Sequence, residues 1–310
     1  MNQLDLLGAD VGNAYLEAKT REKVYIIGRV GFKELEGHTL IIFKALYGFN
    51  SSGARWHDRL VDALRDLGFA QTKADSDVWM RRAGNVYEYI AVYTDDLAIV
   101  SPDPKAIIDA LEKRSGFKLK GVGPLQYHLG CDYTRDNDGT LVYGPRRYIE
   151  KMITTYEKMF GDLPRQYNSP LERNNHPEID DSKELSKEDT TRYQSMIGAL
   201  QWAISLGRFD IFTAVMTMSR FRAAPREGHI NRLKRIYGYL RKFKHGAIRV
   251  RTNLPDLSEV PDNEYGWLYS VYGNVQEEIP HDAPIPLGKE LVTVTFIDAN
   301  LYHDLIMGGP

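Results

Sequence analysis

The sequence predicts an α+β protein in which an antiparallel sheet packed on helices is followed by a mainly helical region. Two apolar runs, residues 86–93 and 97–100, flank the acidic segment Thr94-Asp95-Asp96, a pattern typical of a β-hairpin. Residues 52–67 place apolar side chains at helical spacing. Beyond Arg147 the helical spacing recurs, so the pattern changes from strands to helices along the chain.

In the first half, residues 3–11 predict a strand that ends in Asp10 and Val11. The helix at 52–67 is followed by Gly68, which suits a C-terminal cap. After the hairpin, two prolines end the strand and an amphipathic helix is expected. The further strands are predicted from β-branched and aromatic enrichment, and the last two are joined by the turn sequence Asp136-Asn-Asp-Gly139. These further elements are strands at 24–30, 39–43, 125–134 and 140–143 and a helix at 105–113.

In the second half, four helices are predicted, with Ser186 as an N-cap candidate upstream of the second. Residues 170–187 are polar and contain proline, which predicts a long loop. Residues 253–288 are acidic and rich in proline, so a linker or an irregular wrap is expected, and 291–298 returns to strand character. The four helices are expected at 148–160, 193–206, 210–221 and 225–243.

Composition sets the broad class of the protein. The chain has 310 residues, of which 43% are hydrophobic and 26% charged, so it is long enough for about two domains with cores of their own. No apolar run approaches the ~20 residues needed to cross a bilayer, and no membrane partner is expected. The single cysteine, Cys131, excludes disulfides and cysteine-based zinc sites within the chain, and a reducing setting fits.

Charge is distributed unevenly along a chain whose net charge is only −2. Residues 220–251 contain eleven basic residues and one acid, Glu227, whereas residues 253–290 are strongly acidic. Such a basic block suggests a polyanion as partner. A solvated basic helix face is the alternative explanation of the charge.

Three carboxylates stand where strands end. Asp10 closes the first strand, and Asp95 and Asp96 occupy the tip of the hairpin. If these strands are neighbours in one sheet, the carboxylates converge at one edge and can hold two Mg²⁺ ions about 3.5–4 Å apart, as phosphoryl transfer requires. The alternative is that Thr-Asp-Asp is only a turn, because Asp is common in turns.

The wider pattern resembles the reverse transcriptase of copia-type LTR retrotransposons, as a fragment of the Pol polyprotein. Asp10-Val-Gly-Asn-Ala-Tyr15 and Tyr93-Thr-Asp-Asp96 are similar to motifs A and C, and Lys44-Ala-Leu-Tyr-Gly-Phe49 with Arg55-Trp56 is similar to the motif B region. Further segments follow in family order, so the resemblance covers nearly the whole chain. They are Phe117-Lys-Leu-Lys120, Tyr127-His-Leu-Gly130, Tyr148-Ile-Glu-Lys151, Tyr193-Gln-Ser-Met-Ile-Gly198, Arg208-Phe-Asp-Ile211 and Leu233-Lys-Arg-Ile-Tyr-Gly-Tyr-Leu240.

The resemblance implies roles for individual residues. Asp10 and Asp95 would be the metal-holding carboxylates, Asp96 the supporting acid, and the Val11 carbonyl a further metal ligand. Tyr15 would lie under the incoming sugar and exclude a 2′-hydroxyl by a steric clash, since attraction alone discriminates poorly against an added hydroxyl. Tyr93 would contact the primer end. Leu129-Gly130 resembles the region that grips the primer, although a strand bend relaxed by glycine explains it equally well.

The resemblance also implies a domain plan. Residues 1–145 would form the palm with partial fingers, 146–245 a helical thumb, and 246–310 a linker with the first strand of a truncated ribonuclease H domain. Asp298 would be the first carboxylate of that domain, and one carboxylate cannot hold two metals, so no ribonuclease H activity is expected. Basic side chains off the apolar stripe of the last helix are expected to be free to face nucleic acid. They are Arg232, Lys234, Arg235, Arg241 and Lys242.

The sequence also departs from the family pattern. Nine residues precede Asp10, which suffice for one strand at about 3.3 Å per residue, so the fingers are expected to be incomplete. Electrostatic clamping of the transferred group is a principal source of catalysis, so loss of the fingers' basic residues should reduce catalytic activity severely. Asn50 and Ser51 stand where the family usually has basic and Gln residues.

The function expected from the resemblance is that of an RNA-directed DNA polymerase core, which transfers nucleotides to a primer 3′-hydroxyl by a two-metal mechanism. The cofactor would be two Mg²⁺ ions, with Mn²⁺ as a substitute. The partners would be an RNA template, a DNA primer, dNTPs and the rest of the Pol polyprotein. The family implies a cytoplasmic virus-like particle followed by nuclear delivery. The alternative is a catalytically inactive relic that retains the fold and the nucleic-acid surface.

Overall fold

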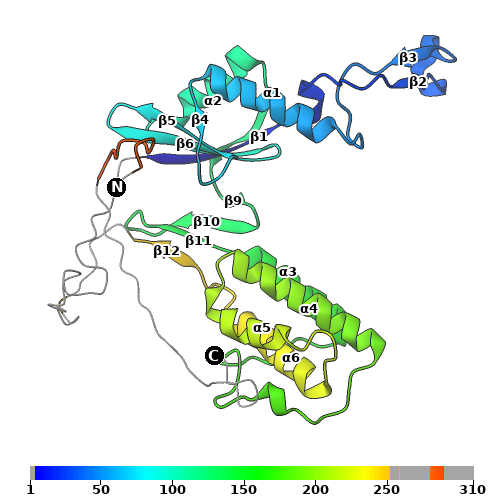
Figure 1. Ribbon diagram of the computed structural model, residues 1–310, viewed down its shortest axis with the longest axis vertical. Helices are drawn as coiled ribbons and strands as arrows, with labels where there is room; N and C mark the ends of the chain where they lie inside the picture. The colour runs from blue at the N-terminus through cyan, green and yellow to red at the C-terminus, as the bar shows by residue number, and fades with distance from the viewer. Residues whose placement is uncertain (1–3, 252–257, 259–279, 290–310) are drawn as a thin grey trace. The chain divides into compact units, whose positions relative to one another are not determined.

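The computed structural model describes residues 4–251, 258 and 280–289. These residues form two compact units, the first reaching Leu125 and including 280–289, the second running from Gln126 to Arg251 (Figure 1). Asp298, the strand expected at 291–298 and most of the linker expected at 253–288 lie outside the described residues. Within the described part of the chain, helices combine with sheets in which every paired strand is antiparallel, so the predicted α+β class is confirmed.

The first unit is built on a six-stranded sheet in the order β4-β5-β6-β7-β1-β8. The predicted hairpin is present as β6 and β7, which pair from Tyr93 opposite Asp96 outwards. Strand β1 lies between β7 and β8, so the first strand of the chain is central in the sheet. The strands are β1 (Asp5–Val11), β4 (Ala70–Gln71), β5 (Val78–Ala83), β6 (Val86–Tyr93), β7 (Asp96–Ser101) and β8 (Leu119–Pro124).

Two helices, α1 (Ser52–Asp66) and α2 (Pro104–Ser115), cover one face of this sheet (Figure 1). Their buried faces contribute Trp56, Leu60 and Leu111, which pack against inward side chains of the sheet such as Ile90. Helix α2 begins after Asp103, whose side chain accepts a hydrogen bond from the Ala106 N–H. The sheet therefore has one face buried under helices and one face that these helices leave open.

A separate two-stranded ribbon, β2 (Tyr25–Ile27) with β3 (Thr39–Ile41), extends from the layers of the first unit (Figure 1). Both strands were predicted, although they are shorter than expected. Of two short 3₁₀ segments, Ala14–Glu17 precedes β2 and Val30–Leu35 lies in the connection between β2 and β3.

The sheets differ from the prediction in several places: strands β4, β5 and β8 were not predicted, and one predicted strand is divided in two. Strand β5 was missed because Arg81 and Arg82 interrupt its apolar pattern; in the structure Arg81 pairs across the sheet with Glu88 at 2.7 Å. The single strand expected at 125–134 is wrong, because Leu129 and Gly130 both have positive φ and turn the chain back between β9 (Tyr127–His128) and β10 (Cys131–Arg135). Positive φ at both loop residues is the pattern of a type I′ hairpin.

The second unit combines a four-stranded sheet, in the order β12-β11-β10-β9, with a helical layer. Its core contains Ile149, Tyr193, Val215 and Leu233, one from each of the four helices. Ser186 caps the second of these helices as predicted, by accepting a hydrogen bond from the Asp189 N–H. The remaining elements are β11 (Leu141–Gly144), α3 (Arg146–Phe160), α4 (Lys187–Ser205), α5 (Phe212–Ser219), α6 (Glu227–Lys242) and β12 (Ile248–Val250).

The division between the compact units falls at Leu125/Gln126, and the expected palm–thumb division at 145/146 stays a prediction. Strands β9 to β11 pair with one another and with β12 to form a sheet of the second unit, so they do not continue the sheet that carries Asp10. Residues 248–250, expected at the start of a linker, form the edge strand β12. No helix in the described residues has the length and hydropathy that crossing a bilayer demands.

Candidate active site at the acidic hairpin

The acids at the ends of β1 and β7 lie directly opposite one another. Asp10 is the register partner of Asp96 in the antiparallel β1–β7 pair. The next residue, Val11, donates its backbone N–H to the carbonyl of Asp95 at 2.8 Å. The predicted approach of the amino-terminal acid to the hairpin acids is therefore present in the structure.

These acids lie on the open face of the sheet. Side chains alternate between the two faces of a strand, and on β1 Ala9 and Val11 are buried in the core under the helices. On β7, Leu97 and Ile99 are buried in the same core. Asp10 and Asp96 consequently belong to the opposite face, which α1 and α2 do not cover.

The electrostatic environment of Asp10 is unfavourable to its ionised form. Burial raises the pKa of the Asp10 carboxyl, and the negative charges of Asp95 and Asp96 raise this pKa further. Lys120 acts in the opposite direction and lowers it. The net result is a pKa above the ordinary value, so the acids repel one another without full compensation by the protein.

Lys120 reaches this site from the neighbouring strand. It is the register partner of Asp10 in the β1–β8 pair. A Cβ at Gly12 would lie 2.7 Å from Lys120 Cε, so glycine at this position leaves room for the lysine side chain. The sequence indicated the segment that contains Lys120 but not its role; the role follows only from the register of β8.

The acids by themselves are too few for an all-protein metal cage. The described residues contain no group of three or more His, Cys, Asp and Glu side chains that could hold a metal ion. Magnesium, however, is usually held by one or two carboxylates together with water and substrate phosphates. Carboxylates that repel one another also favour a divalent cation between them, because the cation removes the repulsion. The donor set therefore fits Mg²⁺ bound together with a phosphorylated substrate.

The aromatic residues of motifs A and C flank the acids. Tyr15 stacks on Tyr47, with ring centroids 4.5 Å apart, and its position after Asp10 is set by the 3₁₀ turn Ala14–Glu17. Tyr93 is 58% exposed at the end of β6. Both tyrosines line a cavity of about 260 Å³, together with Trp56, His57 and Thr94. Tyr47 was not assigned a role from the sequence, although it lies inside the motif B segment.

The basic residues of α6 were expected to be free to face nucleic acid, but contacts within the protein engage them, and their binding to nucleic acid stays a prediction. The segment at 164–182 lies along α6 and supplies hydrogen-bond acceptors to four of the five side chains. Helical periodicity reports which side of a helix is apolar, but it does not report what else covers the polar side. Arg232 donates to Asn175 (2.8 Å) and to Asp180, Arg235 to Glu172 (2.9 Å) and Ser169 (3.2 Å), Arg241 to the Pro164 carbonyl (2.9 Å) and Lys242 to Asn168, while Lys234 lies 4.4 Å from the centre of the Phe160 ring.

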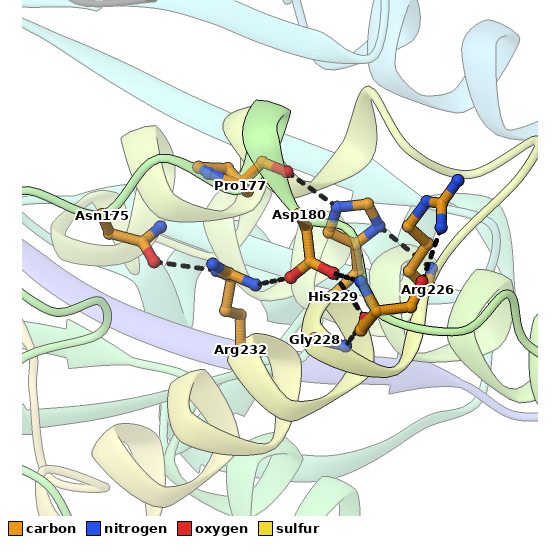
Figure 2. A network of polar contacts seen from close by, with 8 residues as sticks. Asn175, Pro177, Asp180, Arg226, Gly228, His229 and Arg232 are labelled. Carbon is orange, nitrogen blue, oxygen red and sulfur yellow. Dashed lines mark hydrogen bonds and ion pairs between the residues drawn. The ribbon is translucent and has the colours of Figure 1, made fainter.

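Asp180 is at the centre of this contact (Figure 2). Burial alone would raise the pKa of its carboxyl, but hydrogen bonds from Ser182 and Arg232 outweigh burial and hold the pKa below its ordinary value. His229 lies beside it: its Nδ1 accepts the Arg226 backbone N–H at 3.0 Å, and its Nε2 is 2.9 Å from the Pro177 carbonyl. This arrangement requires neutral His229 with the proton on Nε2, and burial correspondingly lowers its pKa.

Comparison with known proteins supports the resemblance seen in the sequence. The model of the family described as "Reverse transcriptase (RNA-dependent DNA polymerase)" matches residues 4–162, which include the whole acidic site. This match covers half of the chain.

Individual relatives are transposon proteins. The chain is 28% identical over 260 residues to the "Retrovirus-related Pol polyprotein from transposon RE1" of Arabidopsis thaliana, a match that covers 83% of this chain and 17% of that protein. It is 26% identical over 250 residues to the transposon Ty5-1 protein YCL074W of Saccharomyces cerevisiae, with 78% of each chain covered. It is also 26% identical over 249 residues to the Pol polyprotein from transposon TNT 1-94 of Nicotiana tabacum, covering 77% of this chain and 18% of that protein. The chain thus spans about a sixth of the length of the Pol polyproteins it matches.

Proposed function

The chain belongs to the reverse transcriptase family, in the branch found in copia-type transposon Pol polyproteins, and from this premise we propose that it is an RNA-directed DNA polymerase core. In this proposal it extends the 3′-hydroxyl of a DNA primer on an RNA template and uses dNTPs as substrates. The rest of the Pol polyprotein is its covalent partner. A virus-like particle in the cytoplasm, with later delivery to the nucleus, is the location that the proposal entails.

One observation carries the proposal. Asp10 is paired in register with Asp96, and the Val11 N–H binds the carbonyl of Asp95, so two segments far apart in the sequence bring three acids together at the end of the β6–β7 hairpin. A turn that served only to reverse the chain would not need a third acid on the adjacent strand. The register therefore favours a site for chemistry over a simple turn.

Asp10 and Asp95 would hold the cation pair, with Asp96 and the Val11 carbonyl as supporting ligands. When bound, two Mg²⁺ ions (or Mn²⁺ in their place) stabilise the charge that develops on the attacking and leaving oxygens of an in-line phosphoryl transfer. Lys120 partly offsets the negative charge at Asp10 and so lowers the pKa of this carboxyl, which favours its ionised form before substrate binds.

The tyrosines would select and orient the reactants. Tyr15, held by its stack on Tyr47, would exclude a nucleotide that carries a 2′-hydroxyl. A rigid aromatic wall is suited to this task, because a clash rejects a larger ligand more strongly than lost attraction does. Tyr93, exposed beside Asp96, would contact the primer end.

In this proposal the first unit serves as the palm and the helices α3 to α6 as the thumb that follows the duplex. Nucleic-acid binding by α6 stays a prediction. Lys234 and Lys242 are its best-placed members, because their described contacts are with a neutral ring and a neutral amide. Phosphate contacts by such residues neutralise charge without reading sequence.

Primer extension on an RNA template tests the proposal. The full chain is compared with Asp95→Asn and with Asp62→Asn, a control at an exposed position of α1. Extension that depends on Mg²⁺, is lost in Asp95→Asn and is retained in Asp62→Asn supports the assignment. Equal signals from all three chains would reject the assigned chemistry and favour the inactive relic.

A further inference from the structure

Trp56 connects helix α1 to the acidic hairpin. Its side chain is 2% exposed, and its indole N–H donates a hydrogen bond of 2.6 Å to the carbonyl of Thr94, the residue before Asp95. We propose that Trp56 is a positioning residue for the acidic hairpin: its indole holds the turn in the conformation that presents Asp95 to Asp10. This inference rests on the proposed function for its catalytic meaning, while its geometry stands on the structure itself.

The turn needs such support because its conformation is strained. Thr94 and Asp95 are the two loop residues between β6 and β7, and Thr94 has φ 57. Positive φ at the first loop residue alone is the pattern of a type II′ turn, a position that glycine normally occupies. A non-glycine residue there is strained, and such strain persists only where the surrounding structure holds it in place.

The described contacts hold the turn from two sides. The Thr94 carbonyl accepts the Trp56 indole N–H from α1, and the Asp95 carbonyl accepts the Val11 N–H from β1 at 2.8 Å. Packing contributes less, because Thr94 and Tyr93 are exposed and border the cavity of about 260 Å³. Besides the strand pairing of Tyr93 with Asp96, these two hydrogen bonds restrain the backbone at Asp95.

The same indole also supports the strand that carries Lys120. The ring of Trp56 packs edge-on against Phe117, with centroids 5.3 Å apart. The next residue, Lys118, accepts the Gly12 N–H with its carbonyl at 2.9 Å. Trp56 thus contacts both the turn that bears the hairpin acids and the segment that leads to Lys120.

A matched residue separates this role from ordinary packing. Trp79 is also fully buried, at 1% exposure, and belongs to the same core. If Trp56 acts only as a large apolar side chain, substitution by phenylalanine should have the same kind of effect at either position. If the indole N–H positions the turn, only Trp56→Phe should weaken the hydrogen bond between Val11 and Asp95 and change the position of Asp95 relative to Asp10.

The experiment compares Trp56→Phe, Trp79→Phe, Thr94→Gly and Trp56→Phe/Thr94→Gly with the unsubstituted full chain. Hydrogen exchange of the Val11 amide reports the bond to Asp95 without requiring any activity. Isothermal titration with Mg²⁺ alone reports the cation affinity. Replacement of Trp56 by benzothienylalanine, which keeps the shape of the indole and removes the N–H, covers the case in which Trp56→Phe does not fold.

We expect Trp56→Phe to accelerate Val11 exchange about tenfold and to weaken Mg²⁺ binding about tenfold, the scale of an outer-shell ligand change. Thr94→Gly should restore part of both losses, because glycine adopts positive φ without help. Trp79→Phe should change neither.

Unchanged Val11 exchange in Trp56→Phe or in the benzothienylalanine chain would overturn the inference, as would equal changes in Trp79→Phe. Absence of Mg²⁺ binding by the unsubstituted chain would instead count against the metal chemistry of the proposed function. Val11 exchange would still decide the role of Trp56 in that case.

Discussion

Asp10 in the first unit and Asp180 in the second are both partly buried carboxylates, yet their pKa values are displaced in opposite directions. Asp10 faces two further acids, Asp95 and Asp96, which add to burial in raising its pKa. Asp180 is surrounded by donors, and hydrogen bonds from Ser182 and Arg232 lower its pKa in spite of burial. The neighbouring groups, not burial, decide whether the pKa of each carboxyl is raised or lowered.

This difference separates two uses of buried charge. Around Asp180, donors of the protein itself satisfy the acid, and the result is a connection between α6 and the segment at 175–182 (Figure 2). Around Asp10 the protein assembles like charges, and in the proposed function a bound cation would relieve their repulsion. Like-charge clusters on an open face are typical of functional sites, whereas satisfied networks are typical of structural ones.

The largest expected effect is on activity at Asp10. Asp10→Asn should lower the rate of primer extension by at least about 10²-fold, because it removes a carboxylate that would hold the cation pair. It should also raise the free energy of unfolding, because the repulsion by Asp95 and Asp96 disappears. Primer extension and urea denaturation of the same preparation measure both. A variant that loses stability and keeps its activity would break the contrast with Asp180.

The next effect is on stability at Asp180. Arg232→Met should lower the free energy of unfolding by about 3 kcal/mol, because it leaves a buried carboxylate without its cationic partner. Asp180→Asn in the same chain should recover part of this loss, since the remaining side chain is neutral. Urea denaturation of the single and double variants measures the coupling. If the double variant is no more stable than Arg232→Met, the ion pair does not explain the loss.

A smaller effect concerns pH and His229. Its lowered pKa means that the unfolded chain binds more protons than the folded one as pH falls through about 6.5. Stability should therefore decrease from pH 7.5 to 5.5, and His229→Gln should reduce this slope. The charges near His229 act in both directions: Asp180 raises its pKa, and Arg232 and Arg226 lower it. Urea denaturation at several pH values measures the slope; the same slope in His229→Gln would assign it to another group.

The two acids should also differ in the sign of their own pH dependence. The pKa of Asp10 is raised in the folded protein. The contribution of this carboxyl to the free energy of unfolding should therefore fall as pH rises from about 3.8 through its pKa in the folded protein. The pKa of Asp180 is lowered in the folded protein. The contribution of this carboxyl to the free energy of unfolding should therefore rise with pH between its pKa in the folded protein and about 3.8. Stability measured against pH for Asp10→Asn and Asp180→Asn, each relative to the unsubstituted chain, should show differences of opposite sign.

The smallest expected effect is at an exposed ion pair between α6 and the segment at 164–182. Glu172 pairs with Arg235 at 2.9 Å, but its side chain is 72% exposed. Glu172→Gln should change the free energy of unfolding by no more than about 0.5 kcal/mol, because water competes for an exposed ion pair. A loss comparable to that of Arg232→Met would show that exposure does not rank these pairs.

Much of the fold could be predicted because its signals are local. The apolar run at residues 86–93, the helical spacing of 52–67 and the cap at Ser186 all act within a few residues, and the structure contains the corresponding elements. The acids of the candidate site were identified in the same way, since each stands at the end of a predicted strand.

The rest could not be predicted because it depends on pairing between distant segments. The arginines of β5 interrupt its apolar pattern, and Arg81 is accommodated in the sheet because it pairs with Glu88 on the neighbouring strand β6. Trp56 is 38 residues from the turn it binds, and Asp180 is 52 residues from Arg232. No periodicity within α6 reveals that another segment covers its basic side.

The sequence by itself determined the class of fold, most of the helices and strands, and the acids that match the family, because propensity and side-chain period are properties of neighbouring residues. Only the tertiary structure decided which acids repel and which are satisfied. Strand register and loop closure bring together groups that are remote in the chain, and the sign of each pKa shift follows from what those groups are.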